Sequence, residues 1–147
     1  MDSFDERILQ ALKKSGKVAN VELANQVGLS ASATLRRVQD LERKGVIKGY
    51  KVVLDHSQLG VAFIAYVSIG LSSHSKAAQL AFEEHVYFVD EVVECHNITG
   101  ANEYLLRIET CDLASYKRIH ADVLGECEYV KSITTMVVMD SPKDERQ

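Results

Sequence analysis

The sequence predicts an α+β fold of two domains: an amino-terminal (winged) helix-turn-helix domain over residues 1–53 and a ferredoxin-like βαββαβ sandwich over residues 62–141. Three observations predict it. The first part shows the apolar spacing of helices, and the second alternates between strand and helix patterns. Residues 1–53 hold ten Lys/Arg against six Asp/Glu, whereas residues 54–147 hold seven against fifteen. The polar stretch Asp55–Gly60 separates the two, so we expect a linker at residues 54–61 and a tail at 142–147.

The composition is that of an ordinary folded protein. Of its 147 residues, 46% are hydrophobic and 26% charged, which excludes low-complexity and collagen-like chains. No apolar run approaches the roughly 20 residues that span a bilayer, and the acidic start lacks signal-peptide features. We therefore expect a cytoplasmic protein. Its three cysteines form no C-x-x-C pair, so we expect reduced structural thiols, no metal site and no cofactor.

Three helices are expected in the first domain. Ser3 and Glu6 fit a capping box, and a helix from Ser3 ends near Gly16. Asn20 is a favourable N-cap for a second helix, whose inner residues include Ala24. Ser30 caps a third helix that runs to about Lys44. Its expected apolar stripe is Leu35, Val38 and Leu41.

The turn between the second and third helices predicts a helix-turn-helix. The segment Gly28–Ser30 is short, and the small side chain of Ala24 lets the two helices approach closely. The third helix then projects toward a groove of about 12 Å, the width of the DNA major groove. The positive charge of this domain favours such a partner, because basic side chains attract polyanions locally. The partner expected is double-stranded DNA.

On the third helix, the face opposite the expected stripe carries Ser32, Arg36 and Arg43, and Arg37 flanks it. Arginine, lysine and hydroxyl side chains bind phosphates, and arginine binds guanine edges bidentately. We expect phosphate contacts from the four basic residues and base-edge contacts near the start of the helix. The candidates are Ser30, Ser32, Thr34, Arg36, Arg37, Arg43 and Lys48. Residues Val46–Leu54 alternate as a short β-element, typical of a basic wing.

The second domain shows strand, helix, strand, strand, helix and strand in that order. We expect strands at Ala62–Leu71, Val89–Thr99, Glu103–Glu109 and Val130–Met139. The helices are expected at Lys76–Val86, with Ala78, Ala81, Phe82 and His85 inward, and after the Asp112 cap, with Leu113, Tyr116, Ile119 and Val123 inward. This order predicts an antiparallel sheet with both helices on one face.

The strands also predict self-association. In the first strand Phe63 and Val67 point to one face, while Ile64 and Tyr66 point to the other. A sheet with one solvated face alternates between apolar and polar residues, and this one is apolar on both. We therefore expect a homodimer in which a second copy covers the helix-free face. A dimer also suits DNA, because paired recognition helices bind paired half-sites.

Several segments together resemble the Lrp/AsnC (leucine-responsive/asparagine-responsive, feast/famine) family of bacterial and archaeal regulators. In the first domain these are Asp2–Leu9, Asn20–Ala24, Val27–Ser30, Leu35–Val38 and Gly45–Ile47. In the second they are Glu94–His96, Thr99–Leu106 and Val137–Met139. The resemblance covers nearly the whole chain, and it implies a nucleoid-associated transcriptional regulator that responds to an amino acid.

The resemblance further implies dimers that associate, commonly into octamers, and an effector near the loop after the second strand. On this chain the loop residues are Gly100, Ala101, Asn102, Glu103 and Tyr104. We expect loop amides to hold the effector's carboxylate, and Glu103 or strand-end carbonyls to hold its ammonium. Asn102 could instead set the turn, and Tyr104 could belong to the core. Two departures stand out: Glu103 replaces the family's usual Asp, and Ser30–Thr34 lacks the family's prolines.

Two other function classes remain open from the sequence. One is a DNA-organising protein without an effector. The other is an enzyme, because some relatives of this family are siroheme-type decarboxylases that use basic and histidine residues of the second domain. The five histidines here are scattered, and no catalytic motif is present, so we expect no enzymatic activity.

Overall fold

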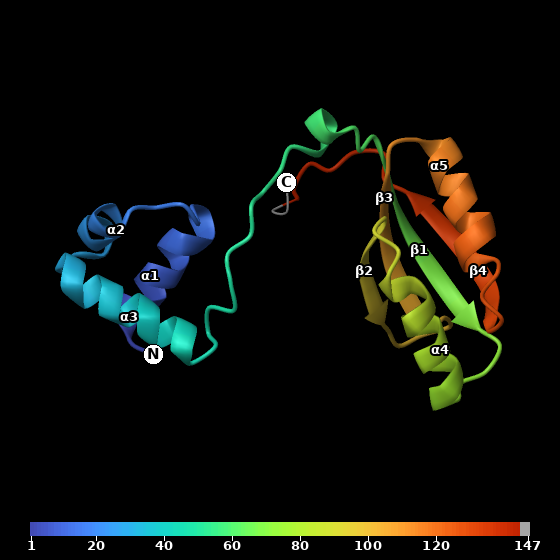
Figure 1. Ribbon diagram of the computed structural model, residues 1–147, viewed down its shortest axis with the longest axis horizontal. Helices are drawn as coiled ribbons and strands as arrows, with labels where there is room; N and C mark the ends of the chain where they lie inside the picture. The colour runs from blue at the N-terminus through green and yellow to red at the C-terminus, as the bar shows by residue number, and fades with distance from the viewer. Residues whose placement is uncertain (145–147) are drawn as a thin grey trace. The chain divides into compact units, whose positions relative to one another are not determined.

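The computed structural model describes residues 1–144, and the chain divides into two compact units at Val53/Leu54. The first unit contains α1 (Ser3–Lys14), α2 (Asn20–Val27) and α3 (Ala31–Arg43). The second contains η1 (His56–Leu59), β1 (Phe63–Leu71), α4 (Lys76–Tyr87), β2 (Val92–Asn97), β3 (Tyr104–Thr110), α5 (Leu113–Arg118), η2 (Ile119–Leu124) and β4 (Val130–Val137). Both units are drawn in Figure 1. The predicted fold class is confirmed.

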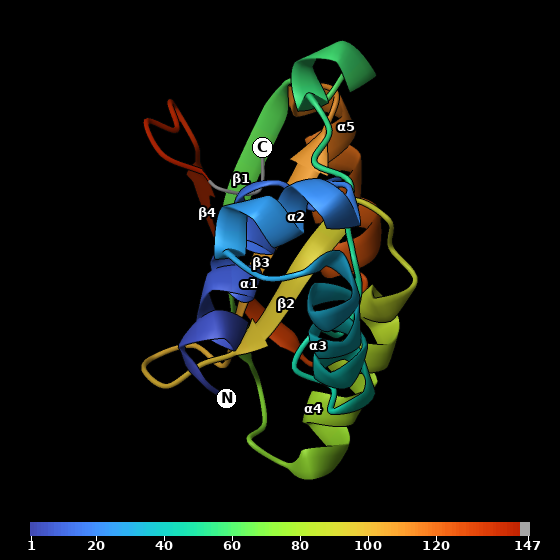
Figure 2. The ribbon, with the colours of Figure 1, turned by 90° about the vertical axis from the view of Figure 1, so that its left-hand side faces the viewer.

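The first unit is a three-helix bundle around a small core. Ile8 of α1, Leu23 and Val27 of α2 and Leu41 of α3 are buried together. Gly28 ends α2 in the left-handed conformation (φ 75°), which glycine adopts without steric cost. Ser30 caps α3 by accepting a hydrogen bond from the Ala33 amide. This is the predicted helix-turn-helix (Figure 2).

The structure corrects several details of this unit. The capping box of α1 is formed by Asp2 and Asp5, not by Ser3 and Glu6. Ala19 occupies the N-cap of α2, while Asn20 donates its side-chain amide to the Ala31 carbonyl. In both cases the N-cap lies one residue before the predicted cap, a common error for sequence-based boundaries.

No β-element forms between Val46 and Leu54, contrary to prediction. The amides of Val46 and Ile47 instead bond to the Leu41 carbonyl and close the end of α3. Beyond them Val52 and Val53 are largely exposed. A strand requires a neighbour for its backbone hydrogen bonds, and the described residues of one chain supply none here.

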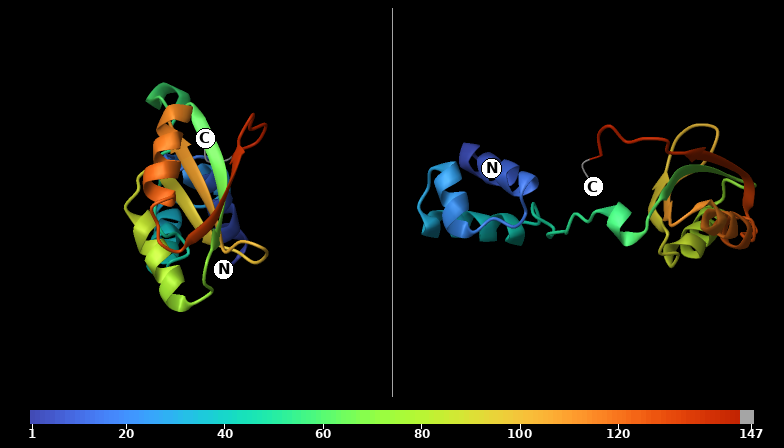
Figure 3. Two further views of the ribbon diagram at one scale, coloured as in Figure 1. Left: turned by 90° about the vertical axis from the view of Figure 1, so that its right-hand side faces the viewer. Right: turned by 90° about the horizontal axis from the view of Figure 1, so that it is seen from above.

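The second unit is a four-stranded antiparallel sheet in the order β2-β3-β1-β4. Both α4 and α5 lie on one face of it (Figure 3, right). The core between sheet and helices includes Val67, Ile69, Phe82, Leu106 and Leu124. The predicted βαββαβ order is therefore confirmed, although β2 is shorter than expected at both ends.

The helices of this unit depart from prediction at their inner faces. Val86 is buried whereas His85 is exposed and contacts the Val123 carbonyl through Nε2 at 2.6 Å. Leu113 is exposed, and the helix that begins there changes at Ile119 into a π-helical segment. The wider π turn shifts the phase of the residues that follow, so Leu124 takes the core position.

The helix-free face of the sheet is less apolar than predicted. Tyr66 pairs with Arg107 across β1 and β3, and Arg107 is only 2% exposed. Its guanidinium binds Glu109 at 2.8 Å, Asp144 at 3.3 Å and the Tyr66 hydroxyl at 2.9 Å. Asp144 belongs to the predicted tail. Part of this face is therefore covered by the chain's own carboxyl-terminal residues.

Candidate functional site

The exposed face of α3 is the candidate nucleic-acid interface. Ser32, Arg36 and Gln39 are exposed along it, as are Arg43 and Lys48. Arg36 forms no ion pair with any residue among 1–144, and Arg43 is bound to Asp40. An exposed guanidinium such as that of Arg36 provides N–H donors for phosphate oxygens and guanine edges.

Two predicted DNA-facing residues are engaged inside the unit. Thr34 is fully buried, and its hydroxyl donates to the Ser30 carbonyl at 3.0 Å, so the expectation that it approaches base edges is wrong. Arg37 is clamped by Asp2 at 2.8 Å and Asp5 at 2.7 Å, and it lies over the Phe4 ring. Ser30 remains exposed, but its hydroxyl serves as the helix cap.

The contacts between Arg37 and its two carboxylate partners affect the pKa values of those carboxylates. Hydrogen bonding from the Arg37 guanidinium lowers the pKa of Asp5 below its usual value, and the Asp2 amide lowers it further. For Asp2 the Asp5 amide is the larger cause, with Arg37 adding to the lowered pKa. The clamp joins the start of α1 to the middle of α3 and thereby fixes the recognition helix.

The exposed face of α3 is rotated about the helix axis relative to the face that the sequence predicts. Thr34, Val38 and Leu41 point inward, and Leu35 is 47% exposed. Leu35 and Gln39 are therefore additional candidates that the sequence analysis missed. Their chemistry is suitable, because glutamine hydrogen-bonds adenine and apolar side chains contact the thymine methyl group. Thr34 is also spaced four residues before Val38, and that spacing was the available signal.

The β2–β3 loop is the second candidate site. Gly100 and Ala101 are exposed, and Gly100 has a φ of 124°, which favours glycine. Asn102 donates to the Ser68 hydroxyl at 2.7 Å and accepts from the Ser132 hydroxyl at 3.4 Å. These contacts attach the loop to β1 and β4.

Each carboxylate oxygen of Glu103 already has a partner within the second unit. Its Oε2 accepts from the Leu71 amide at 2.6 Å, and its Oε1 lies 2.9 Å from His74 Nδ1. The Glu103 side chain is 12% exposed, whereas that of His74 is 89% exposed. His74 is therefore the exposed partner of Glu103, whereas the hydrogen bond from the Leu71 amide is partly buried.

Tyr104 is part of the core, which settles one of the alternatives left by the sequence. It is 1% exposed, its ring centroid lies 4.7 Å from that of Phe82, and its hydroxyl donates to Glu83. Burial raises the pKa of this phenol above its ordinary value. An effector wall at Tyr104 is therefore wrong, because no part of its ring reaches the surface of the loop.

The cysteines only partly match their expected structural role. Cys127 is buried, but Cys95 and Cys111 are exposed, and all three are free thiols. No group of three or more metal-ligating side chains is arranged to hold an ion within residues 1–144. In that same range no helix has the length and apolar character needed to cross a bilayer.

Fold and site together define a class. A helix-turn-helix with an exposed basic face, followed by a ferredoxin-like domain, is typical of a transcriptional regulator. The "Winged helix-turn-helix DNA-binding" profile matches residues 1–48, and the "Lrp/AsnC ligand binding domain" profile matches residues 64–147. The chain belongs to the Lrp/AsnC family of transcriptional regulators.

Individual relatives span almost the whole chain. It is 36% identical to a proline dehydrogenase transcriptional activator of Rhizobium radiobacter over 98% of its length and 92% of the relative. It is 34% identical to the leucine-responsive regulatory protein of Escherichia coli K12, over 97% and 87% respectively. A transcriptional regulator of Neisseria meningitidis, solved in complex with L-Met, superposes with a TM-score of 0.94 at 29% identity, covering 98% of this chain and 93% of that one.

Proposed function

We propose that this regulator binds operator DNA through the exposed face of α3, with Arg36 as the central contact. The observation that carries the proposal is the contrast between two neighbouring arginines. Arg37 is held by two carboxylates, whereas Arg36 is exposed and free of ion pairs among residues 1–144. Ser32, Arg43 and Lys48 flank it, and we assign them phosphate contacts. Arg37 is assigned a positioning role.

We infer that the active form is a homodimer, which associates further into octamers as the family resemblance implies. The support is partial cover of the helix-free sheet face: Met136 remains 47% exposed beside the Arg107 cluster. A two-fold arrangement lets one surface cover itself, and it pairs two recognition helices for two half-sites. We place this assembly on the DNA in the cytoplasm, as a nucleoid-associated protein.

We infer that an amino acid binds at Gly100–Glu103. The exposed amides of Gly100 and Ala101 suit the effector's carboxylate, and Glu103 suits its ammonium once His74 moves aside. The Neisseria relative was solved with L-Met, which supports an amino acid as the effector class. The ligand would act by its different affinity for different assemblies. The role is regulatory rather than catalytic, in keeping with the named relatives.

The test is a thermal-shift screen of the twenty amino acids on the full chain, followed by DNA binding with the best ligand. We expect one or a few amino acids to raise the melting temperature and to change the affinity or stoichiometry on duplex DNA. DNA binding that no amino acid alters, with no thermal shift, would favour the effector-independent DNA-organising role instead.

A further inference from the structure

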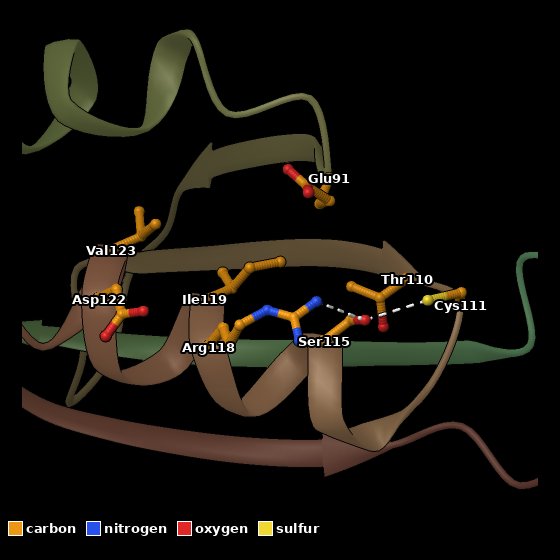
Figure 4. Close-up of a pocket in the computed structure, with 8 residues that line it drawn as sticks. All are labelled: Glu91, Thr110, Cys111, Ser115, Arg118, Ile119, Asp122 and Val123. Carbon is orange, nitrogen blue, oxygen red and sulfur yellow. Dashed lines mark hydrogen bonds between the residues drawn. The ribbon is translucent and has the colours of Figure 1, made fainter.

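A cavity lies at the end of β3 opposite the Gly100–Glu103 loop. Its volume is about 450 Å³, large enough for an amino acid. Three segments form it: the residue before β2, the end of β3, and the helical stretch α5–η2 (Figure 4). Its lining residues are Glu91, Thr110, Cys111, Ser115, Arg118, Ile119, Asp122 and Val123.

Arg118 is oriented by a chain of hydrogen bonds that runs through Ser115 to the Asp112 carboxylate. Its Nη2 donates to the Ser115 hydroxyl at 3.0 Å, and that hydroxyl lies 3.0 Å from Cys111 Sγ. Ser115 is fixed in turn, because its amide donates to the Asp112 carboxylate that caps α5. The guanidinium has five N–H donors, and within residues 1–144 it meets no carboxylate at ion-pair distance. A preoriented arginine of this kind is suited to bind a carboxylate group.

Opposite charges line the same cavity without meeting. Glu91 lies across it from Arg118 in Figure 4, and Asp122 lies one helical turn beyond Arg118. Neither carboxylate comes within the 4.0 Å of Arg118 that would make an ion pair among the described residues. Ile119 and Val123 add apolar surface to the lining of the same cavity. A small molecule that carries both charges and an aliphatic part complements this lining.

The backbone at the cavity has an uncommon shape. Ile119–Leu124 is π-helical, a conformation that is rare and often found at functional sites. The π-helical segment ends at Gly125. A Cβ added at this residue would lie 2.8 Å from the Ala121 carbonyl oxygen. The widened turn carries Asp122 and Val123, two of the lining residues.

We propose that this cavity is a second amino-acid site, distinct from the β2–β3 loop. Arg118 binds the ligand's α-carboxylate, Glu91 binds its α-ammonium, and Ile119 and Val123 contact the side-chain stem. The lining bears two carboxylates and one guanidinium, so a basic side chain that reaches Asp122 is preferred over an acidic one. The ligand class rests on the proposed amino-acid response, whereas the location rests on the cavity alone.

Protection of Cys111 from alkylation tests the proposal. Cys111 lines the cavity and is exposed, Cys127 is buried, and partial burial with the nearby Glu83 raises the pKa of Cys95 to about 11. The full chain is treated with iodoacetamide in the presence of L-lysine, L-leucine or L-glutamate, and each cysteine is quantified by mass spectrometry. We expect L-lysine to slow alkylation of Cys111 most and L-glutamate least.

Matched variants separate the site from the rest of the chain. Arg118→Gln should weaken the L-lysine protection by about tenfold or more, since a charged hydrogen-bonding partner is lost. Lys117→Gln removes the same charge from the adjacent residue, which does not line the cavity, and should leave protection unchanged. Because Arg118→Gln can alter the basal rate, the ratio of rates with and without ligand is compared.

The outcomes also distinguish this site from the loop. If no probe protects Cys111, or if Arg118→Gln is protected as well as the unmodified chain, the second site is overturned. A thermal shift that is lost in Asn102→Ala while Cys111 stays unprotected supports the loop alone. Protection of Cys111 that survives Asn102→Ala and is lost in Arg118→Gln establishes the second site whatever happens at the loop.

Discussion

Arg36 and Arg37 are adjacent in sequence, yet their contacts in the structure differ. Arg37 stabilises the first unit through Asp2, Asp5 and the Phe4 ring, so using it for DNA would cost those contacts. Arg36 has no such cost. A charged residue's availability for a ligand therefore depends on whether the fold already uses it, which composition and spacing do not reveal.

Arg36→Ala should weaken binding to the operator by about 1–3 kcal/mol, because it removes a contact at the centre of the recognition face. Fluorescence anisotropy with a labelled duplex measures the change. Lys117→Ala removes a positive charge from the second unit and should leave the affinity nearly unchanged. Undiminished operator affinity in a folded Arg36→Ala variant would contradict the assignment.

Asp5→Asn should destabilise the first unit near pH 7 and lose that effect in acid. The pKa of Asp5 is lowered in the folded chain by Arg37, so its stabilisation is present above the unfolded value of 3.8 and disappears as pH falls through the folded pKa. Thermal unfolding followed by circular dichroism at about pH 7 and about pH 2 measures this.

The control for this pH dependence is Glu6→Gln, which removes one negative charge from the same helix. Glu6 forms no ion pair within residues 1–144, so its substitution should change the melting temperature little at either pH. An Asp5→Asn penalty of equal size at both pH values would show that the Arg37 ion pair is not its source.

At the scale of elements, Gly70 in β1 shows how closely the loop site is packed. A Cβ at this position would lie 2.3 Å from Ser132 Oγ and 2.7 Å from Asn102 Oδ1. Both atoms belong to the hydrogen-bonded group that attaches the β2–β3 loop to the sheet. Close packing at Gly70 therefore couples the sheet to the proposed effector loop.

Gly70→Ala should destabilise the second unit by about 1–3 kcal/mol, as overpacking does, and should weaken amino-acid binding at the loop. Chemical denaturation and the thermal-shift assay measure the two effects. The double variant Gly70→Ala/Ser132→Ala removes the nearer clash and should recover part of the stability. Full stability and ligand response in Gly70→Ala would show that the loop is not constrained from this side.

Elements with their own strong periodicity could be predicted from the sequence, and those that depend on a neighbour could not. The βαββαβ order is carried by each strand and helix separately. The predicted inward face of α3 was wrong because Thr34, a polar residue, occupies a core position. Its hydroxyl can be buried there because it donates a hydrogen bond to the Ser30 carbonyl. The β-element at Val46–Leu54 failed because strand pairing requires a partner that the pattern does not specify.

The loop between β2 and β3 forms where the sequence predicts a turn, but only some of the contacts of its side chains were predictable. Counting by two from Leu106, which is buried, places Tyr104 on the same inner face, so its position was predictable. The partners of Glu103 and Asn102 were not, because the Leu71 amide and Ser68 lie more than thirty residues away in sequence. Such contacts follow from strand register, which single-sequence patterns leave open.

At the scale of the molecule, residues near both ends of the second unit bind side chains on the helix-free face of the sheet. His56 Nδ1 of η1 lies 3.1 Å from Glu109, and Asp144 binds Arg107, the neighbour of Glu109 in the same cluster. The cluster covers part of the surface that the sequence predicts to be apolar. The proposed pairing of two copies would use the apolar residues beside it, such as Ile64 and Met136.

Sedimentation velocity of the full chain with a fluorescently labelled operator duplex tests the central claim most directly, with the best amino acid from the screen titrated in. The account predicts that labelled DNA sediments with two or more protomers, and that the ligand changes the size or population of those complexes. A single protomer that leaves the duplex unbound at low salt, with or without ligand, would contradict it.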